Sequence, residues 1–144
     1  MAIDPAALRQ VAAWLTPGKV VLLDFPDAKK KKFFVVGQVY PDLLLIVINS
    51  VPLKHPKLCA ECQVGMAGGE GSAYPFFSHI ESYANCYQIV DSILRETAMR
   101  QLAANPRWMK GEINPETRTK IVEAIKKSDV IEPIRLKALL KALS

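Results

Sequence analysis

The most constraining feature of this sequence is the stretch from Lys19 to Ser50, in which two short breaks separate three apolar runs. The runs cover residues 19–25, 33–40 and 43–49, and a Pro-Asp pair follows each of the first two. Runs rich in Val, Ile and Phe between such breaks are typical of antiparallel strands. The sequence therefore predicts a three-stranded meander. Its third strand is continuously apolar, so we expect it to be covered on both faces.

Helical patterns stand on both sides of this meander. Asp4-Pro5 predicts a helix start and Pro17-Gly18 a helix end, which gives an N-terminal helix within residues 1–16. After residue 91, apolar residues recur at helical spacing, so 92–144 is expected to be a helical extension. Residues 17–91 would form a small antiparallel β-barrel. With 144 residues, half of them hydrophobic, the chain is expected to be a single α+β domain with a core of its own.

The remaining elements are expected from turn residues and local composition. The predicted strands are 59–64, 74–80 and 82–90, with a glycine-rich mobile loop at 65–72, helices at 92–105, from Asn114-Pro115 and from Glu132-Pro133, and a connector at Arg107–Gly111.

Four consecutive lysines stand in the predicted first loop of the meander: Lys29, Lys30, Lys31 and Lys32. Their mutual repulsion has to be offset by solvent, by salt or by an anionic partner. One interpretation is a phosphate clamp that binds nucleic acid without regard to sequence. The other is a solvated hairpin tip that discourages edge-to-edge aggregation. The net charge of +5 is compatible with both.

Three cysteines, Cys59, Cys62 and Cys86, leave an odd count for disulfide pairing. Together with the lack of an apolar leader, this predicts free thiols and a cytoplasmic protein. The longest apolar run, Leu43–Ile48, is too short to cross a membrane. Cys59 and Cys62 could begin a zinc site or a redox pair. The irregular spacing of further ligands and the strand-like flanks favour incidental thiols instead, so no metal and no cofactor are predicted.

The two histidines, His55 and His79, could each act as an acid or base near neutral pH, or satisfy a local hydrogen-bond network. Neither stands in a recognisable hydrolase or metalloprotease motif.

The first half of the chain resembles the PemK/MazF family of toxin-like proteins. The residues that carry the likeness are the opening run from Pro17-Gly18 to Asp24-Phe25, the basic turn and second apolar strand after it, Ile48-Asn49-Ser50, and the run Ser82–Ile89 with its Gln-Ile pair. Members of this family are small SH3-like barrels, usually dimeric, and many are sequence-specific ribonucleases held inactive by an antitoxin. The resemblance, over roughly residues 15–95, implies an SH3-like barrel and a homodimer.

The resemblance also implies a candidate site. An endoribonuclease would use Lys32 to stabilise charge, Ser50 to position a proton or phosphate oxygen, and His55 or His79 as acid or base. Active family members, however, carry an arginine where Lys32 or a neighbouring lysine stands, and lysine lacks the bidentate fork of arginine. We therefore expect a non-catalytic binding module related to toxin–antitoxin systems, with a protein partner such as an antitoxin, or single-stranded RNA bound by Lys29–Lys32. The alternative is a metal-independent endoribonuclease, so whether the chain is an enzyme stays open.

Overall fold

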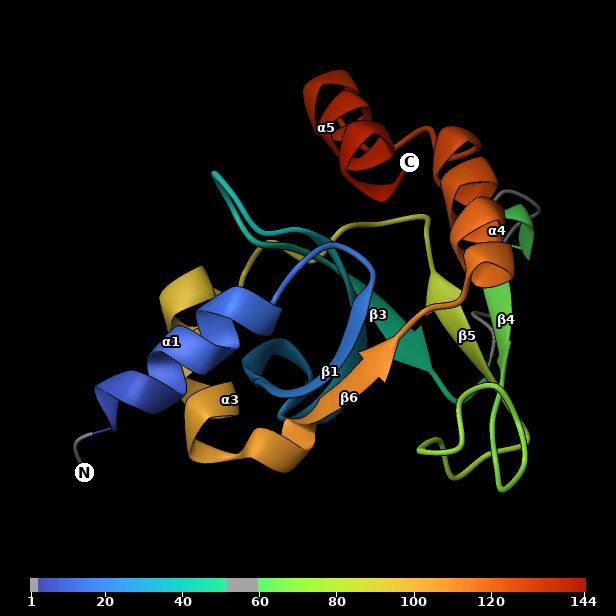
Figure 1. Cartoon of the computed structure of the whole chain (residues 1–144). Helices are drawn as coiled ribbons and strands as arrows, with labels where there is room; N and C mark the ends of the chain where they lie inside the picture. Colours follow the sequence, from blue (N-terminus) through green and yellow to red (C-terminus); the bar gives the residue numbers. More distant parts are fainter. Residues whose placement is uncertain (1–2, 52–59) are drawn as a thin grey trace.

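The structure is a computed structural model that describes residues 3–51 and 60–144 (Figure 1). Its helices and strands, in chain order, are α1 (Pro5–Trp14), β1 (Lys19–Phe25), the 3₁₀ turn η1 (Pro26–Ala28), β2 (Lys30–Gln38), β3 (Leu44–Asn49), β4 (Gln63–Ala67), β5 (Glu81–Asn85), α3 (Arg95–Ala104), the 3₁₀ turn η2 (Pro106–Trp108), β6 (Met109–Glu112), α4 (Pro115–Lys126) and α5 (Pro133–Leu143). None of the helices in these ranges combines the length and the apolar character needed to cross a lipid bilayer.

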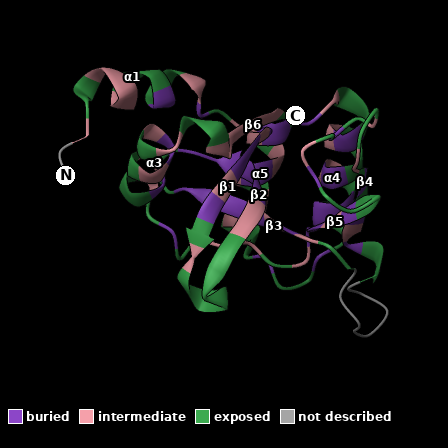
Figure 2. Cartoon of the chain, turned by 90° about the horizontal axis from the view of Figure 1, so that it is seen from below, coloured by how far each residue is buried: buried purple, intermediate pink, exposed green. Residues whose placement is uncertain are grey.

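The six strands form one curled antiparallel sheet, a half-barrel, in the order β4-β5-β3-β2-β1-β6. Side chains alternate between the two faces of a strand, so this sheet serves two hydrophobic cores. Val20, Val35 and Ile46 belong to the core that includes α4 and α5. Val21, Phe34 and Leu45 belong to the core that includes α1 and α3. Figure 2 shows the buried strand centres and the exposed tip of the β1–β2 hairpin. The α+β prediction is confirmed.

Local capping signals predicted the starts of α1 and α4 correctly, whereas the helix expected from residue 92 begins at Arg95 without a side-chain cap. The Asp4 carboxylate accepts a hydrogen bond from the Ala6 N–H, and the Asn114 side chain accepts one from the Thr117 N–H. Each satisfies a backbone donor that a helix start leaves unpaired. The α5 helix begins at Pro133 and buries Leu139 and Leu143, as its apolar spacing predicts.

Three of the four lysines belong to a strand and not to a loop, which corrects the sequence prediction. Lys30, Lys31 and Lys32 begin β2 and pair with Phe25, Asp24 and Leu23 of β1. The turn itself is η1, and Lys29, with a φ of 53°, closes it. Pairing with β1 extends the strand through a basic run that looks loop-like in isolation, because strand preference depends on the neighbouring strand.

Other elements also differ from expectation. The predicted connector at 107–111 contains β6, which pairs with β1 at the edge of the sheet. The strand expected at 59–64 begins at Gln63 and runs into the predicted glycine loop, and Cys59 lies outside the described residues. The strand expected at 74–80 is a series of turns with one bridge, from Tyr74 to Gly68. Leu94, within the helix expected at 92–105, is exposed and lies just before α3.

Candidate functional site

A small pocket opens where the β1–β2 hairpin, the end of β3 and the segment before β5 meet. Its volume is about 170 Å³. The residues that line it are Lys30, Lys31, Lys32, Phe33, Ile48, Asn49, Ser50, Phe77, Ser78, His79 and Ser82. We call it the lysine–histidine pocket.

Lys32 is held in this pocket by the neighbouring strand. Its Nζ donates a hydrogen bond to the Asn49 Oδ1 at 2.7 Å. The contact is possible because β2 and β3 pair antiparallel, with Phe33 opposite Ile48, which brings the ends of the two strands together. Lys32 is half-buried, whereas Lys30 and Lys31 are exposed. Lys32 is therefore the least exposed of the three lysines, and the hydrogen bond to Asn49 orients its ammonium group.

His79 reaches the pocket on a segment that packs closely on β4. The Gly68 N–H donates to the Ile80 carbonyl at 2.7 Å, and the Gly69 N–H donates to the Phe77 carbonyl at 3.0 Å. A Cβ on Gly68 would lie 2.1 Å from the His79 carbonyl oxygen, so only glycine permits this approach.

Aromatic rings fix the same segment from its other side. The ring of Phe77 is buried and meets Phe33 edge to face, with centroids 5.0 Å apart. Phe76 and Tyr74 extend the cluster. Such contacts stabilise beyond the area they bury. The cluster anchors the residues on either side of His79 and leaves the imidazole exposed.

The composition of the pocket lining is basic. Three lysines, one histidine and three serines line the pocket, and none of the lining residues is acidic. Burial lowers the pKa of Lys32, and the nearby charge of Lys30 lowers it further. An anion in the pocket would oppose both effects, because an opposite charge favours the protonated amine. The arrangement is suited to binding a phosphate or another small anion.

The structure brings together three of the four residues predicted as catalytic: Lys32, Ser50 and His79 line one pocket. His55 lies outside the described residues. Sequence reasoning missed Asn49 and Ser82. Asn49 carried a signal, because it is the first polar residue after a continuous apolar strand. Ser82 is buried and carried none.

The cysteines do not form a metal centre within the described part of the chain. Cys62 and Cys86 are buried, and the Cys86 N–H donates to the Cys62 carbonyl at 2.8 Å. Burial raises the pKa of Cys86 strongly, and Cys62 adds to the effect. Across residues 3–51 and 60–144, no three metal-ligating side chains gather around one point. The zinc hypothesis also involved Cys59, which lies outside these ranges.

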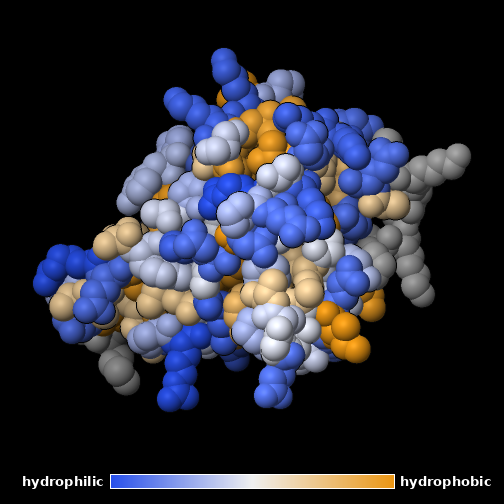
Figure 3. Space-filling model, turned by 45° about the vertical axis from the view of Figure 1, so that its right-hand side comes forward, coloured by the Kyte–Doolittle hydropathy of each residue, from blue (hydrophilic) through white to orange (hydrophobic). Residues whose placement is uncertain are grey.

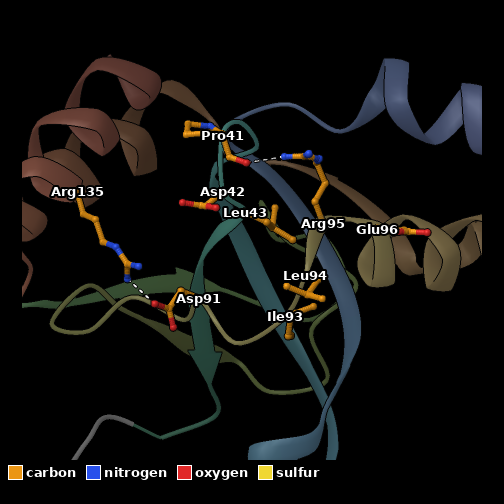
Figure 4. A pocket seen from close by; sticks show the side chains of 9 residues that line it. All are labelled: Pro41, Asp42, Leu43, Asp91, Ile93, Leu94, Arg95, Glu96 and Arg135. Carbon is orange, nitrogen blue, oxygen red and sulfur yellow. Dashed lines mark hydrogen bonds and ion pairs between the residues drawn. The ribbon is translucent and has the colours of Figure 1, made fainter.

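A larger pocket, of about 390 Å³, lies between the β2–β3 turn, the start of α3 and α5 (Figure 4). Its arginines already have protein partners. Arg135 pairs with Asp91 at 2.5 Å, and the Arg95 Nη1 donates to the carbonyls of Val39 and Pro41. The Arg95 guanidinium also lies over the Tyr40 ring. These contacts join three segments of the chain, so we interpret this pocket as a structural junction.

Hydrophobic side chains gather at the end of the molecule where α5 lies, among hydrophilic ones (Figure 3). Leu94, which lines the junction pocket, and Ile134, which precedes Arg135 in α5, are two of the exposed large apolar residues; they are 69% and 83% exposed. The lining of the junction pocket carries both signs of charge, whereas the lining of the lysine–histidine pocket contains no acidic residue.

Comparison of the chain with models of known protein families, with curated proteins and with solved structures finds no match. The functional argument therefore depends on the geometry of the lysine–histidine pocket.

Proposed function

We propose that this chain binds single-stranded RNA, with a backbone phosphate in the lysine–histidine pocket. The observation that carries the proposal is that Lys32, held by Asn49, shares a pocket with Lys30, Lys31 and His79 while no acidic side chain lines it. Phosphate contacts from lysine supply most of the affinity of sequence-independent binding. Serine hydroxyls can donate to the remaining phosphate oxygens.

Fluorescence anisotropy with a labelled single-stranded RNA tests this proposal. Lys32→Gln keeps a polar side chain and removes the charge, and we expect roughly ten-fold weaker binding and a salt slope smaller by about one. Lys137→Gln on α5 is the matched control, because it removes the same charge far from the pocket. Equal losses in the two variants would show that binding depends on net charge alone. Absence of any RNA binding by the unaltered chain would contradict the proposal.

A second candidate, cleavage of RNA without metal, is favoured by the position of His79 in the same pocket as Lys32 and Ser50. The ribose 2′-oxygen would attack the adjacent phosphorus, and the bond to the 5′-oxygen would break as a cyclic phosphate forms. His79 would take the 2′-proton or donate a proton to the leaving oxygen, Ser50 would position a phosphate oxygen, and Lys32 would stabilise the developing negative charge. Discrete fragments from a long RNA in the presence of chelator, lost in His79→Ala, would support cleavage. Intact RNA that nevertheless binds would leave a binding module.

The relationship to PemK/MazF proteins belongs to the same proposal. It is supported by the β1–β2–β3 antiparallel meander and by the convergence of Lys32, Ser50 and His79. On this hypothesis the half-barrel is SH3-like, the chain forms a homodimer, and an antitoxin-like protein is a further partner. Sedimentation velocity tests the dimer, and co-purification of a complex at fixed stoichiometry with the product of an adjacent gene tests the antitoxin.

A further inference from the structure

The two tryptophans of this chain each carry a lysine ammonium over the ring, but the two pairs differ. Lys19 lies 5.3 Å from the Trp14 ring centroid and is also paired with Glu112 at 3.4 Å. Lys31 lies 5.4 Å from the Trp108 ring centroid, and it takes part in no ion pair among the described residues, although Asp24 stands opposite it on β1. Lys31 also lines the lysine–histidine pocket. Lys31 therefore connects the pocket to an aromatic face.

The Trp108 ring is well anchored. Trp108 ends the turn η2, where its backbone N–H donates to the Asn105 carbonyl at 2.9 Å, and its side chain packs against the core beneath α1 and α3. The α3 helix that precedes this turn is tied to the hairpin, because the Gln101 side chain accepts a hydrogen bond from the Asp24 N–H at 2.8 Å. The ring is nevertheless partly exposed. It is a rigid aromatic surface beside the exposed, basic tip of the hairpin.

Further positive charge lies next to this ring in the chain. Arg107 is exposed and Lys110 is half-exposed, and neither takes part in an ion pair among residues 3–51 and 60–144. Basic groups interleaved with an aromatic ring are typical of surfaces that bind single-stranded nucleic acid, because the backbone follows the charge while a base stacks on the ring.

From these contacts we propose that Trp108 and Lys31 form a stacking subsite for a nucleobase next to the phosphate held in the lysine–histidine pocket. The proposal rests on the proposed function. On binding, the base takes the place of the Lys31 ammonium over the indole, and the ammonium moves to the neighbouring phosphate. This exchange is favourable because base stacking on an aromatic ring is stronger than an exposed cation–π contact. Any base can occupy the subsite, since each has a π-face.

Intrinsic fluorescence isolates the subsite. In a Trp14→Phe background, all tryptophan emission comes from Trp108. We expect a short oligouridylate to quench this emission, and an abasic phosphodiester strand of the same length to bind more weakly without quenching it. Binding of both strands is followed separately by competition with a labelled RNA, so the phosphate contacts and the stacking contact are measured independently.

Three variants complete the test in the unaltered background. Trp108→Leu should weaken oligouridylate binding by roughly ten-fold and leave abasic binding unchanged. Trp108→Phe should retain most of the affinity because it keeps an aromatic face, and this separates stacking from a general loss of folding. Trp14→Phe should bind both strands normally. If oligouridylate binds without quenching and Trp108→Leu binds it as the unaltered chain does, the stacking subsite is wrong while the phosphate pocket stands. If neither strand binds, both proposals fall.

Discussion

The hydroxyl of Tyr74 lies 2.6 Å from the hydroxyl of Thr117 and joins the segment that carries His79 to the first turn of α4. The same tyrosine oxygen accepts a hydrogen bond from the Asn114 N–H at 3.1 Å. The Tyr74 hydroxyl is therefore hydrogen-bonded both to the N-cap residue Asn114 and to Thr117 in the first turn of α4. This buried link connects the support of the candidate site to the helical part of the chain.

Tyr74→Phe should lower the free energy of unfolding by about 1–3 kcal/mol, because it leaves the Thr117 hydroxyl and the Asn114 N–H without their buried partner. Urea denaturation measures the change. Tyr83→Phe is the control, since the Tyr83 hydroxyl makes no hydrogen bond within the described residues and its loss should change little. Equal effects from the two substitutions would contradict a specific role for the Tyr74 hydroxyl.

Gly68→Ala should destabilise the protein by about 1–3 kcal/mol and weaken RNA binding, because its Cβ would collide with backbone at His79 and with the Phe77 Cβ. Gly65→Ala in β4, the strand that ends just before Gly68, is a sharp comparison. There the added Cβ meets the end of the Glu81 side chain, which can rotate away. In urea denaturation and in RNA-binding anisotropy, Gly68→Ala should show the larger loss of the two variants. A Gly68→Ala protein that binds RNA normally would show that RNA binding does not require the close approach of residues 77–79 to Gly68.

Lys32 should make stability rise with pH. Its pKa is lowered in the folded protein by burial and by Lys30, so the unfolded chain holds the proton more tightly. The free energy of unfolding therefore increases as pH rises from the pKa of Lys32 in the folded protein toward the ordinary pKa of lysine. Below this pH range Lys32 is protonated in both states, so the destabilisation from burying its charge does not change with pH. Lys32→Met should consequently be at least as stable as the unaltered protein at pH 7, with an advantage that shrinks toward pH 10 or so. Thermal melts across this range measure it, and a marked loss of stability in Lys32→Met at neutral pH would be the opposite result.

Cys86 should resist alkylation in the folded protein. Its side chain is fully buried, and burial raises its pKa, so little thiolate forms and reagents cannot reach it. Peptide mapping after iodoacetamide treatment should find Cys86 unmodified under native conditions at pH 8 and modified in denaturant. Rapid native labelling at Cys86 would instead indicate that β5 opens readily.

The parts of the fold that sequence predicted correctly are those with local causes. Asp4 and Asn114 predict helix starts because the side chain of each accepts a hydrogen bond from a backbone N–H two or three residues later. The bounds of β1 follow from the apolar run and the proline after it. The strand assignment of Lys30–Lys32 could not be predicted locally, because it depends on pairing with β1.

The candidate site shows the same division. Lys32 and Ser50 stand close to the ends of paired strands, so their approach follows from the predicted meander. His79 joins them only because Gly68 and the aromatic cluster place a turn segment against the sheet. No periodic pattern of apolar residues in the sequence predicts this packing. Trp108 lies on a turn before a strand without an apolar pattern, and its relation to Lys31 arises from tertiary packing alone.

The pairing of β6 with β1 has a consequence for how the chain acquires its structure. Lys19 stands opposite Glu112, so one edge of the sheet stays open until the segment that follows α3 is available. A nascent chain that ended at residue 91 would expose the backbone donors and acceptors of β1, a template for pairing with other chains. Contacts between residues so far apart in sequence also slow folding, because a long loop must close first. The early strands of this protein therefore depend on the late residues for protection, and a chaperone or rapid completion of synthesis would matter most in that interval.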